Sequence, residues 1–447
     1  MAKSGKNRTS AAGTSPRSGL RSAPVSRTAL TRLNLSHILR QIREGGPTSR
    51  SSLAEVTGLN KATISRLVDR LLQMRLVHET GEQHSNGRGR RPVLLEVNPQ
   101  AGFIVTAEIG VDFLLVACSD FGARLLWRRF ESWTEPREAD DILNRCWQLL
   151  RKAINFGEAK LGRFFGLALG VPGLVNAADG TLFFAPNLGW RNVPLGRMLR
   201  ERFDVPVFVE NEANLAALGE YYFGAAKGYD DVLYISAGVG VGGGVVHNGR
   251  LVTGTSGVAG EFGHMTLDPD GPPCRCGNRG CWETMASQSA LFRRIRELAA
   301  QGSSTHLVDA TGGDWNRLTV PMVISAAEAG DIVAIDALRD IGVALGIGIA
   351  SLINALNPDL VVFGGPLSTA GPLIFPALKQ EVERRALAWS NSAAQLVYAR
   401  NGQDNCILGG VARVCEWVIH HPLRAVHHAE QRSTQAPAGQ AERALPR

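Results

Sequence analysis

One histidine and three cysteines near the middle of the chain constrain the fold most. His264, Cys274, Cys276 and Cys281 form the array H-x9-C-x-C-x4-C, with three glycines between them. Three thiolates and an imidazole suit tetrahedral Zn²⁺, and the glycines allow a short loop to fold around the ion. Four protein ligands leave no open position, so the array predicts a structural zinc site. Three incidental thiols or a labile disulfide are the alternative, although disulfides are rare in a reducing compartment.

A chain of 447 residues is too long for one ordinary core. Changes in composition and hydrophobic pattern divide it into four segments. We expect a disordered basic tail over 1–30, a winged helix-turn-helix domain over 31–98, a two-lobed α/β domain over 99–422 and a disordered tail over 423–447. The start of the chain lacks the apolar core of a signal peptide, so we expect a cytoplasmic protein without a membrane partner.

The long third segment contains two stretches that begin alike. Strands are expected at 103–109 and 113–118 around one glycine turn, and at 232–236 and 244–247 around another. This repetition predicts a duplicated α/β unit with two lobes. The apolar run 341–356 is typical of a buried helix, because a membrane span needs about 20 apolar residues.

The segment 31–98 has the layout of a DNA-binding domain. A helix that begins near Leu33 ends at Gly45-Gly46-Pro47, a short helix covers 51–57, and a third covers 61–74. Gly58 suits the left-handed turn before the third helix, and Asn60 suits its N-cap. Two strands, at 76–80 and 93–97, flank a basic loop, which completes a winged helix-turn-helix.

The polar residues of this segment are the candidate contacts to double-stranded operator DNA. The third helix exposes its N-terminal half to the major groove, and the wing can enter a minor groove or clamp phosphates. Residues 1–96 carry 17 Lys or Arg against 6 Asp or Glu, whereas the whole chain has a net charge of only +7. A three-helix unit that mediates only protein contacts is the alternative. The candidate DNA contacts are Lys61, Thr63, Ser65, Arg66, Arg88, Arg90 and Arg91.

The stretch Glu261-Phe-Gly-His264, followed by Cys274-x-Cys276-Gly-x-x-Gly-Cys281-x-Glu283, resembles the signature of the ROK family of sugar kinases and repressors. The resemblance extends over roughly residues 30–415, and the N-terminal segment is similar to the xylose-repressor and N-acetylglucosamine-repressor branch. It implies an N-terminal winged helix-turn-helix plus an α/β two-lobed, actin-like ATPase (sugar kinase-like) domain. A small sugar or sugar phosphate would bind in the cleft, and operator symmetry would require a homodimer or homotetramer.

The resemblance also implies the residues that contact the sugar hydroxyls. Carboxylates and amides suit vicinal hydroxyls, each of which donates and accepts hydrogen bonds. His264 would bind zinc through one ring nitrogen and the sugar through the other. Taken alone, Asn187 and Asn211 are equally typical of capping or surface residues. The implied sugar-binding set is Asn187, Asn211, Glu212, Glu261, His264 and Glu283.

Three positions depart from the kinases of this family. Their first phosphate loop reads Asp-x-Gly-Gly-Thr, whereas the corresponding stretch here, from Glu108 to Asp112, reads Glu-Ile-Gly-Val-Asp. In the second phosphate loop, Val239 replaces the threonine of the kinases. Glu212 replaces the aspartate that acts as general base, and its extra methylene displaces the carboxylate by about 1 Å. We therefore expect Glu212 to be a degenerate base, ATP not to be a cofactor, and the chain to sense a sugar without phosphorylating it. A bifunctional ATP-dependent sugar kinase and a ligand-blind architectural DNA binder are the alternatives.

Overall fold

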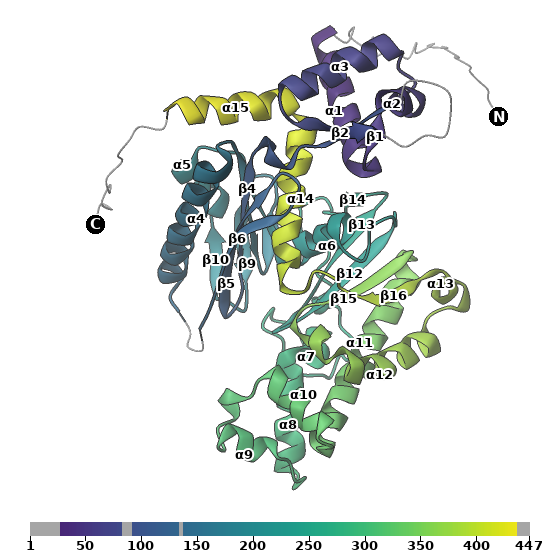
Figure 1. Ribbon diagram of the computed structural model, residues 1–447. Coiled ribbons are helices and arrows are strands. Elements are labelled where there is room, and N and C mark those ends of the chain that lie inside the picture. Colours follow the sequence, from purple (N-terminus) through teal and green to yellow (C-terminus); the bar gives the residue numbers. More distant parts are fainter. Residues whose placement is uncertain (1–26, 83–91, 134–136, 436–447) are drawn as a thin grey trace, which may run out of the picture.

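The computed structural model describes residues 27–82, 92–133 and 137–435. Figure 1 shows an N-terminal domain at one end of the molecule, followed by two α/β lobes, each built around its own sheet. The N-terminal domain consists of α1 (Arg27–Gly45), β1 (Thr48–Ser49), α2 (Arg50–Thr57), α3 (Lys61–Gln73), β2 (Val77–Glu82) and β3 (Val93–Val97).

The N-terminal domain is a winged helix-turn-helix, as the sequence predicts. Gly58 ends α2 in the left-handed conformation, with φ of 69°. The Asn60 side chain caps α3, because its Oδ1 accepts a hydrogen bond from the backbone N–H of Thr63 at 2.8 Å. The three strands pair in the order β1-β3-β2.

The expected N-terminal tail is too long by four residues, because α1 begins at Arg27 rather than after residue 30. Once a helix is nucleated, each added residue gains a backbone hydrogen bond at little cost, which favours this extension. Residues 1–26 of the expected tail lie outside the described residues. The same holds for most of the basic wing loop, including Arg88, Arg90 and Arg91.

The two lobes contain sheets of the same topology, which confirms the predicted duplication. In each sheet the first strand in the sequence is central, two antiparallel strands lie on one side and two parallel strands on the other. The first sheet has the order β11-β7-β4-β5-β6, with β4 (Phe103–Ile109), β5 (Phe113–Asp120), β6 (Leu125–Ser132), β7 (Phe164–Val171) and β11 (Val207–Asn211). The second has the order β14-β13-β12-β15-β16, with β12 (Val232–Ala237), β13 (Val241–His247), β14 (Arg250–Leu251), β15 (Leu360–Gly364) and β16 (Gln395–Tyr398).

Helices cover both sheets, and a small third sheet extends the first lobe. None of the helices in the described ranges is both long and apolar enough for a membrane span. The first lobe also contains α4 (Ala139–Leu161), α5 (Leu195–Phe203), β8 (Leu174–Asn176), β9 (Thr181–Ala185) and β10 (Trp190–Val193). The second lobe contains α7 (Glu283–Ala286), α8 (Gln288–Ala300), α9 (Leu307–Thr311), α10 (Val320–Glu328), α11 (Ile332–Leu356), α12 (Gly371–Arg385) and α13 (Ala388–Ala393). The buried helix predicted at 341–356 is the C-terminal part of α11.

Two helices, α6 (Glu212–Phe223) and α14 (Asn405–His420), join the lobes. Helix α6 packs on β12 and β13 of the second sheet, and α14 packs on β4 and β7 of the first. The two helices cross with their backbones in contact. A Cβ added to Gly409 would lie only 1.7 Å from the carbonyl oxygen of Leu215, so this position requires glycine.

The expectation of a disordered tail over 423–447 is wrong for its first part. Residues 422–435 form helix α15 (Pro422–Gln435), and residues 436–447 lie outside the described part of the chain. Ala425, Val426 and Ala429 are buried on one side of this helix, and Arg163 binds Glu430 at 2.6 Å. Three small apolar residues in a polar stretch give a weak hydrophobic pattern. The helix is therefore stabilised by tertiary packing rather than by its own composition.

The N-terminal domain shares an apolar core with the first lobe. Buried residues of α1 and α3 pack in one cluster with residues of β4, β7, α14 and α15. The boundary expected at residue 98 coincides with the end of β3, but the core continues across it. The winged helix is therefore held directly against the lobe that follows it.

Candidate metal and sugar site

The four predicted metal ligands come together in the second lobe. Their ligand atoms all lie within 4.8 Å of one another, and this cluster can hold a metal ion. The Sγ atoms of Cys276 and Cys281 are 3.7 Å apart, and Cys274 Sγ is 3.7 Å from His264 Nδ1. Ligands about 2.3 Å from a tetrahedral zinc ion lie about 3.8 Å from one another, so the residues fit zinc. A disulfide would need a sulfur separation of about 2 Å.

A tight loop positions these ligands. His264 ends a short 3-10 helix over Phe262–His264, and isolated bridges pair Thr266 with Cys281 and Pro273 with Arg279. Gly280 has φ of 61°, and a Cβ there would lie 1.5 Å from the carbonyl oxygen of Asp268. Glycine therefore lets the loop close on itself and bring the cysteines back toward the histidine.

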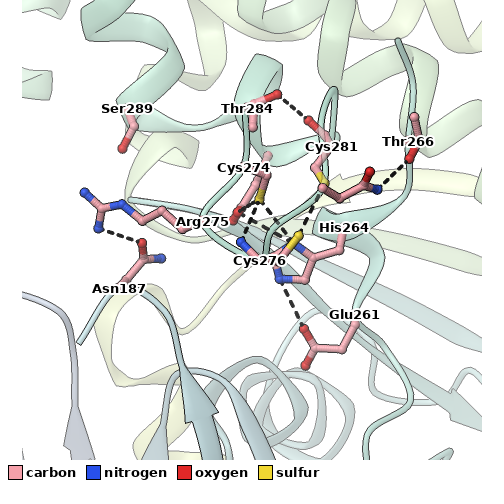
Figure 2. A network of polar contacts seen from close by, with 12 residues as sticks. Asn187, Glu261, His264, Thr266, Cys274, Arg275, Cys276, Cys281, Thr284 and Ser289 are labelled. Atoms are coloured by element: carbon pink, nitrogen blue, oxygen red, sulfur yellow. Dashed lines mark hydrogen bonds and ion pairs between the residues drawn. The ribbon is translucent and has the colours of Figure 1, made fainter. Parts of the chain in front are cut away.

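The histidine faces the cysteines with one ring nitrogen and a carboxylate with the other (Figure 2). Its Nε2 lies 3.8 Å from Glu261 Oε2, and its Nδ1 lies 3.6 Å from Glu283 Oε1. The Cys274 thiol donates a hydrogen bond to the same Glu283 oxygen at 3.0 Å. Glu261 and Glu283 thus border the Cys/His cluster.

Asn187 approaches this cluster from the first lobe. It lies between β9 and β10, and its Oδ1 accepts a hydrogen bond from Arg275 Nη1 at 3.2 Å (Figure 2). Arg275 belongs to the cysteine loop of the second lobe, so this bond crosses between the lobes. Arg275 was not among the predicted site residues, because its partner Asn187 lies 88 positions away in the chain. Its place between Cys274 and Cys276 was the only available signal.

Asn211 and Glu212 lie where β11 passes into α6. Asn211 caps α6, since its Oδ1 accepts hydrogen bonds from the N–H groups of Ala213 and Asn214, while its Nδ2 donates to the carbonyl of Gly173. The capping role considered for Asn211 is therefore real. Glu212 has one buried oxygen, Oε2, with no hydrogen-bond partner in the described part of the chain. That oxygen is available to a ligand hydroxyl.

The second phosphate loop, which contains Val239, lies among these residues. A Cβ on Gly240 would meet Glu283 Oε2 at 2.6 Å and Asn187 Nδ2 at 3.5 Å, and one on Gly242 would lie 3.8 Å from Glu212 Oε1. Glycine here keeps the loop out of the space between the side chains. Asn187, Glu212 and Glu283 therefore border one region between the lobes.

Two glutamates at the base of this region have strongly perturbed acidity. Burial raises the pKa of Glu108 to about 8, against a hydrogen bond from the Cys406 thiol that lowers it. Burial also raises the pKa of Glu212 to about 8, and the nearby Glu108 and Glu261 carboxylates add to the shift. Both side chains therefore hold a proton more tightly than an exposed carboxyl does.

This burial predicts a pH dependence of stability. A carboxyl whose pKa is raised from 4.5 to about 8 stabilises the folded state fully below pH 4.5, and this contribution is lost as pH rises through 8. We expect Glu108→Gln to flatten the fall in unfolding free energy between pH 5 and 8, by up to about 1.4 kcal/mol per pH unit. Urea unfolding at several pH values measures this slope. Glu55→Gln, on the exposed side of α2, is the control, and identical slopes for both variants would refute the prediction.

The predicted DNA contacts that the structure describes lie on α3. Lys61 and Arg66 are exposed, and Thr63 and Ser65 are half-buried, while the apolar residues of the helix face the core. The N-terminal half of α3 thus presents polar side chains outward. This matches the surface that a recognition helix offers to the major groove.

Both parts of the chain match models of known protein families. The model of the ROK family matches residues 108–416, and that of the MarR family matches residues 33–80. A putative xylose repressor from Caldicellulosiruptor sp. is 36% identical over 88% of this chain and 98% of its own length.

Solved structures of ROK family proteins also resemble the molecule. The crystal structure of a ROK family transcriptional regulator, a homologue of the Escherichia coli MLC protein, superimposes with a TM-score of 0.77 at 28% identity, over 90% of this chain and 99% of that one. A ROK family glucokinase from Streptomyces griseus, solved with glucose and AMPPNP, gives a TM-score of 0.62 at 32% identity, over 69% of this chain and 98% of that one.

Proposed function

The chain belongs to the ROK family and carries a MarR-type DNA-binding domain, and from this premise we propose that it is a sugar-responsive transcriptional repressor. Its kinase-like domain senses a carbohydrate between the lobes, and its winged helix binds operator DNA. The observation that carries the proposal is the apolar core shared by the winged helix and the first lobe. A ligand that repositions the lobes has a direct mechanical connection to the DNA-binding surface.

The proposed metal is a structural zinc ion held by His264, Cys274, Cys276 and Cys281. The sulfur and nitrogen separations support this assignment. The Cys274 side chain would hold the ion as a thiolate, so its proton would be released to solvent and would no longer be donated to Glu283. Glu283 would then accept a hydrogen bond from a ligand instead, so the ion orders the loop and prepares the sugar site.

The proposed ligand is a small sugar or sugar phosphate held by residues of both lobes. Asn187 and Asn211 come from the first lobe, and Glu261, His264 and Glu283 come from the second, with Glu212 between them. The buried, unpartnered Oε2 of Glu212 supports a hydroxyl ligand, because a buried polar atom without a partner is costly. Glu212, when protonated, donates one hydrogen bond and accepts others, which suits a hydroxyl equally well.

We propose that this sugar is not phosphorylated. Glu212 stands where the kinases of the family have an aspartate, and its extra methylene displaces the carboxylate by about 1 Å, a misplacement that can cost a general base on the order of 100-fold in rate. Val239 offers no hydroxyl to a phosphate, and its carbonyl accepts a hydrogen bond from Ser289. The family includes sugar kinases, so the alternative is that this chain phosphorylates its sugar, and an assay of ATP turnover tests it directly. Incubation with ATP and a panel of hexoses and pentoses should give no more sugar phosphate than the Glu212→Ala control, and clear turnover above that control would establish a kinase.

The DNA half of the proposal predicts a steep salt dependence. Each phosphate contact contributes about 0.9 to the slope of log affinity against log salt. We expect replacement of Arg88, Arg90 and Arg91 by alanine to reduce this slope by up to about 3. Fluorescence anisotropy of a duplex selected from a randomised pool provides the measurement. The control replaces Arg296, Arg317 and Arg339, which are exposed on the second lobe. Equal slopes in both triple variants would exclude the wing from DNA binding.

The working form of the protein is proposed to be a cytoplasmic homodimer or homotetramer. A two-fold assembly places two recognition helices on half-sites about one helical turn apart, as palindromic operators require. The effector would change the spacing or orientation of the paired winged helices.

A further inference from the structure

Helix α1 of the winged helix contacts both of the helices that join the lobes. On one side it packs against α14, since Leu35, Ile38 and Leu39 share a core with Val414 and Val418. Next to this core, Arg40 Nη2 donates to His420 Nε2 at 2.6 Å. The carbonyl oxygen of Glu416 can only accept, so His420 Nδ1 carries the proton and Nε2 is the acceptor. This side of α1 is fixed to the first lobe.

The other contact of α1 is with the C-terminal end of α6. The guanidinium of Arg43 lies 5.3 Å from the centre of the Tyr222 ring and 5.7 Å from that of Phe223. The Tyr222 hydroxyl donates a hydrogen bond to Glu416 Oε1 of α14 at 2.7 Å. Side chains from three helices, one in each structural unit, therefore meet at this point.

Helix α6 connects this contact to the sugar site. It begins at Asn211 and Glu212, packs on the second sheet, and ends at Tyr222 and Phe223. A helix of 12 residues is about 18 Å long and moves as a rigid rod. Its backbone contact with α14 at Gly409 leaves no compressible side chain between the two helices. A rotation of the second lobe about this crossing must displace the far end of α6.

The Arg43 contact is sensitive to such a displacement. Its Nη1 is buried with no hydrogen-bond partner in the described ranges, and the guanidinium is stabilised by two ring faces and by a hydrogen bond with the Cys415 thiol. A cation–π contact weakens as the charge leaves the ring face. A cavity of about 10 Å³, lined by Arg43, Tyr222 and Glu416 among others, leaves little free space beside it. A helix shift of about 1–2 Å, typical of switching proteins, is enough to change this packing.

We propose that Arg43, Tyr222 and Glu416 form the contact through which rearrangement of the sugar cleft alters the position of α1. Helix α3 packs on α1 in the same core, so a shift of α1 carries the recognition helix with it. This inference rests on the proposed sugar-responsive repressor function. It assigns the three residues a role in coupling the sugar site to the DNA-binding domain.

The test compares two arginines of the same helix. Arg43→Met removes the charge from the rings but retains the aliphatic packing, and Arg40→Met removes the same charge from the neighbouring hydrogen bond to His420, which lines the same cavity. The measured quantity is the ratio of dissociation constants for a selected duplex with and without D-xylose, D-glucose or N-acetylglucosamine. Sugar binding itself is followed by the thermal shift of each variant.

Allosteric coupling typically changes affinity by about 5- to 150-fold. We expect Arg40→Met to keep the ratio of the unmodified protein, and Arg43→Met to reduce it to less than about 2-fold. Sugar binding and sugar-free DNA binding should be the same in both variants. A ratio in Arg43→Met equal to that in Arg40→Met would overturn the inference while leaving the proposed function intact.

Tyr222→Leu provides a second variant outside the DNA-binding domain. Tyr222→Leu should lose coupling in the same way as Arg43→Met. Normal coupling in Tyr222→Leu would count against the inference. This variant also decides the question if Arg43→Met binds DNA too poorly to be measured. If none of the sugars changed the DNA affinity of the unmodified protein, the proposed function would fail, and the inference with it.

Discussion

Replacing Cys274 with alanine is expected to abolish stoichiometric zinc binding and all measurable sugar binding. The four ligand atoms lie within 4.8 Å of one another on a loop without regular secondary structure between residues 265 and 281. Structural zinc sites contribute apparent binding free energies of about 10–16 kcal/mol in small peptides, and most of this energy orders the chain around the ion. With three ligands the loop loses its fixed shape, and His264 and Glu283 lose their positions.

Zinc content per chain and the sugar-induced thermal shift measure this effect directly. Cys146→Ala is the control, because Cys146 lies buried in the core of the first lobe, far along the chain from the cluster. This control should retain one zinc ion per chain and its response to sugar. A Cys274→Ala protein with a full complement of zinc and normal sugar binding would show that the cluster is not a metal site.

Replacing Glu261 with alanine is expected to weaken sugar binding by about 10- to 150-fold, while zinc binding is retained. Glu261 is half-buried next to the ring nitrogen of His264 that faces away from the cysteines. A hydrogen bond to a charged group contributes about 1.5–3 kcal/mol, which corresponds to this range of affinities. Its loss also leaves His264 Nε2 without an orienting neighbour.

Isothermal titration calorimetry with the best sugar from a thermal-shift screen measures the loss. The control is Glu328→Ala, since Glu328 is exposed at the end of α10. Zinc content in both variants separates loss of a sugar contact from collapse of the loop. Unchanged sugar affinity in the Glu261 variant would show that the sugar does not bind next to this cluster.

The Cys/His cluster could be predicted from the sequence because its residues are local. Cys274, Cys276 and Cys281 lie within eight positions, so their spacing alone brings them together, and the fold needs only to place His264 beside them. The N-cap of α3 by Asn60 was predictable for the same reason, because the bond spans three residues. The repeated strand and glycine turn likewise predicted two sheets of equal topology.

Features that depend on distant contacts could not be predicted. The proximity of Glu108, Glu212 and Cys406 depends on three elements from different parts of the chain, and no local pattern indicates it. Arg275 was missed because its partner, Asn187, lies in the other lobe. Helix α15 was missed because only a few small apolar residues bury it against the rest of the molecule. A helix that is held mainly by packing against other elements needs few apolar residues of its own, so its hydrophobic periodicity is weak.

The central claim is that a carbohydrate bound between the lobes controls the affinity of the winged helix for DNA. Titration of a labelled, selected duplex with zinc-loaded protein, at one salt concentration with and without saturating sugar, tests it most directly. We predict that the right sugar weakens DNA binding by at least about 5-fold, without ATP. Identical binding curves with every sugar that shifts the melting temperature would contradict the account.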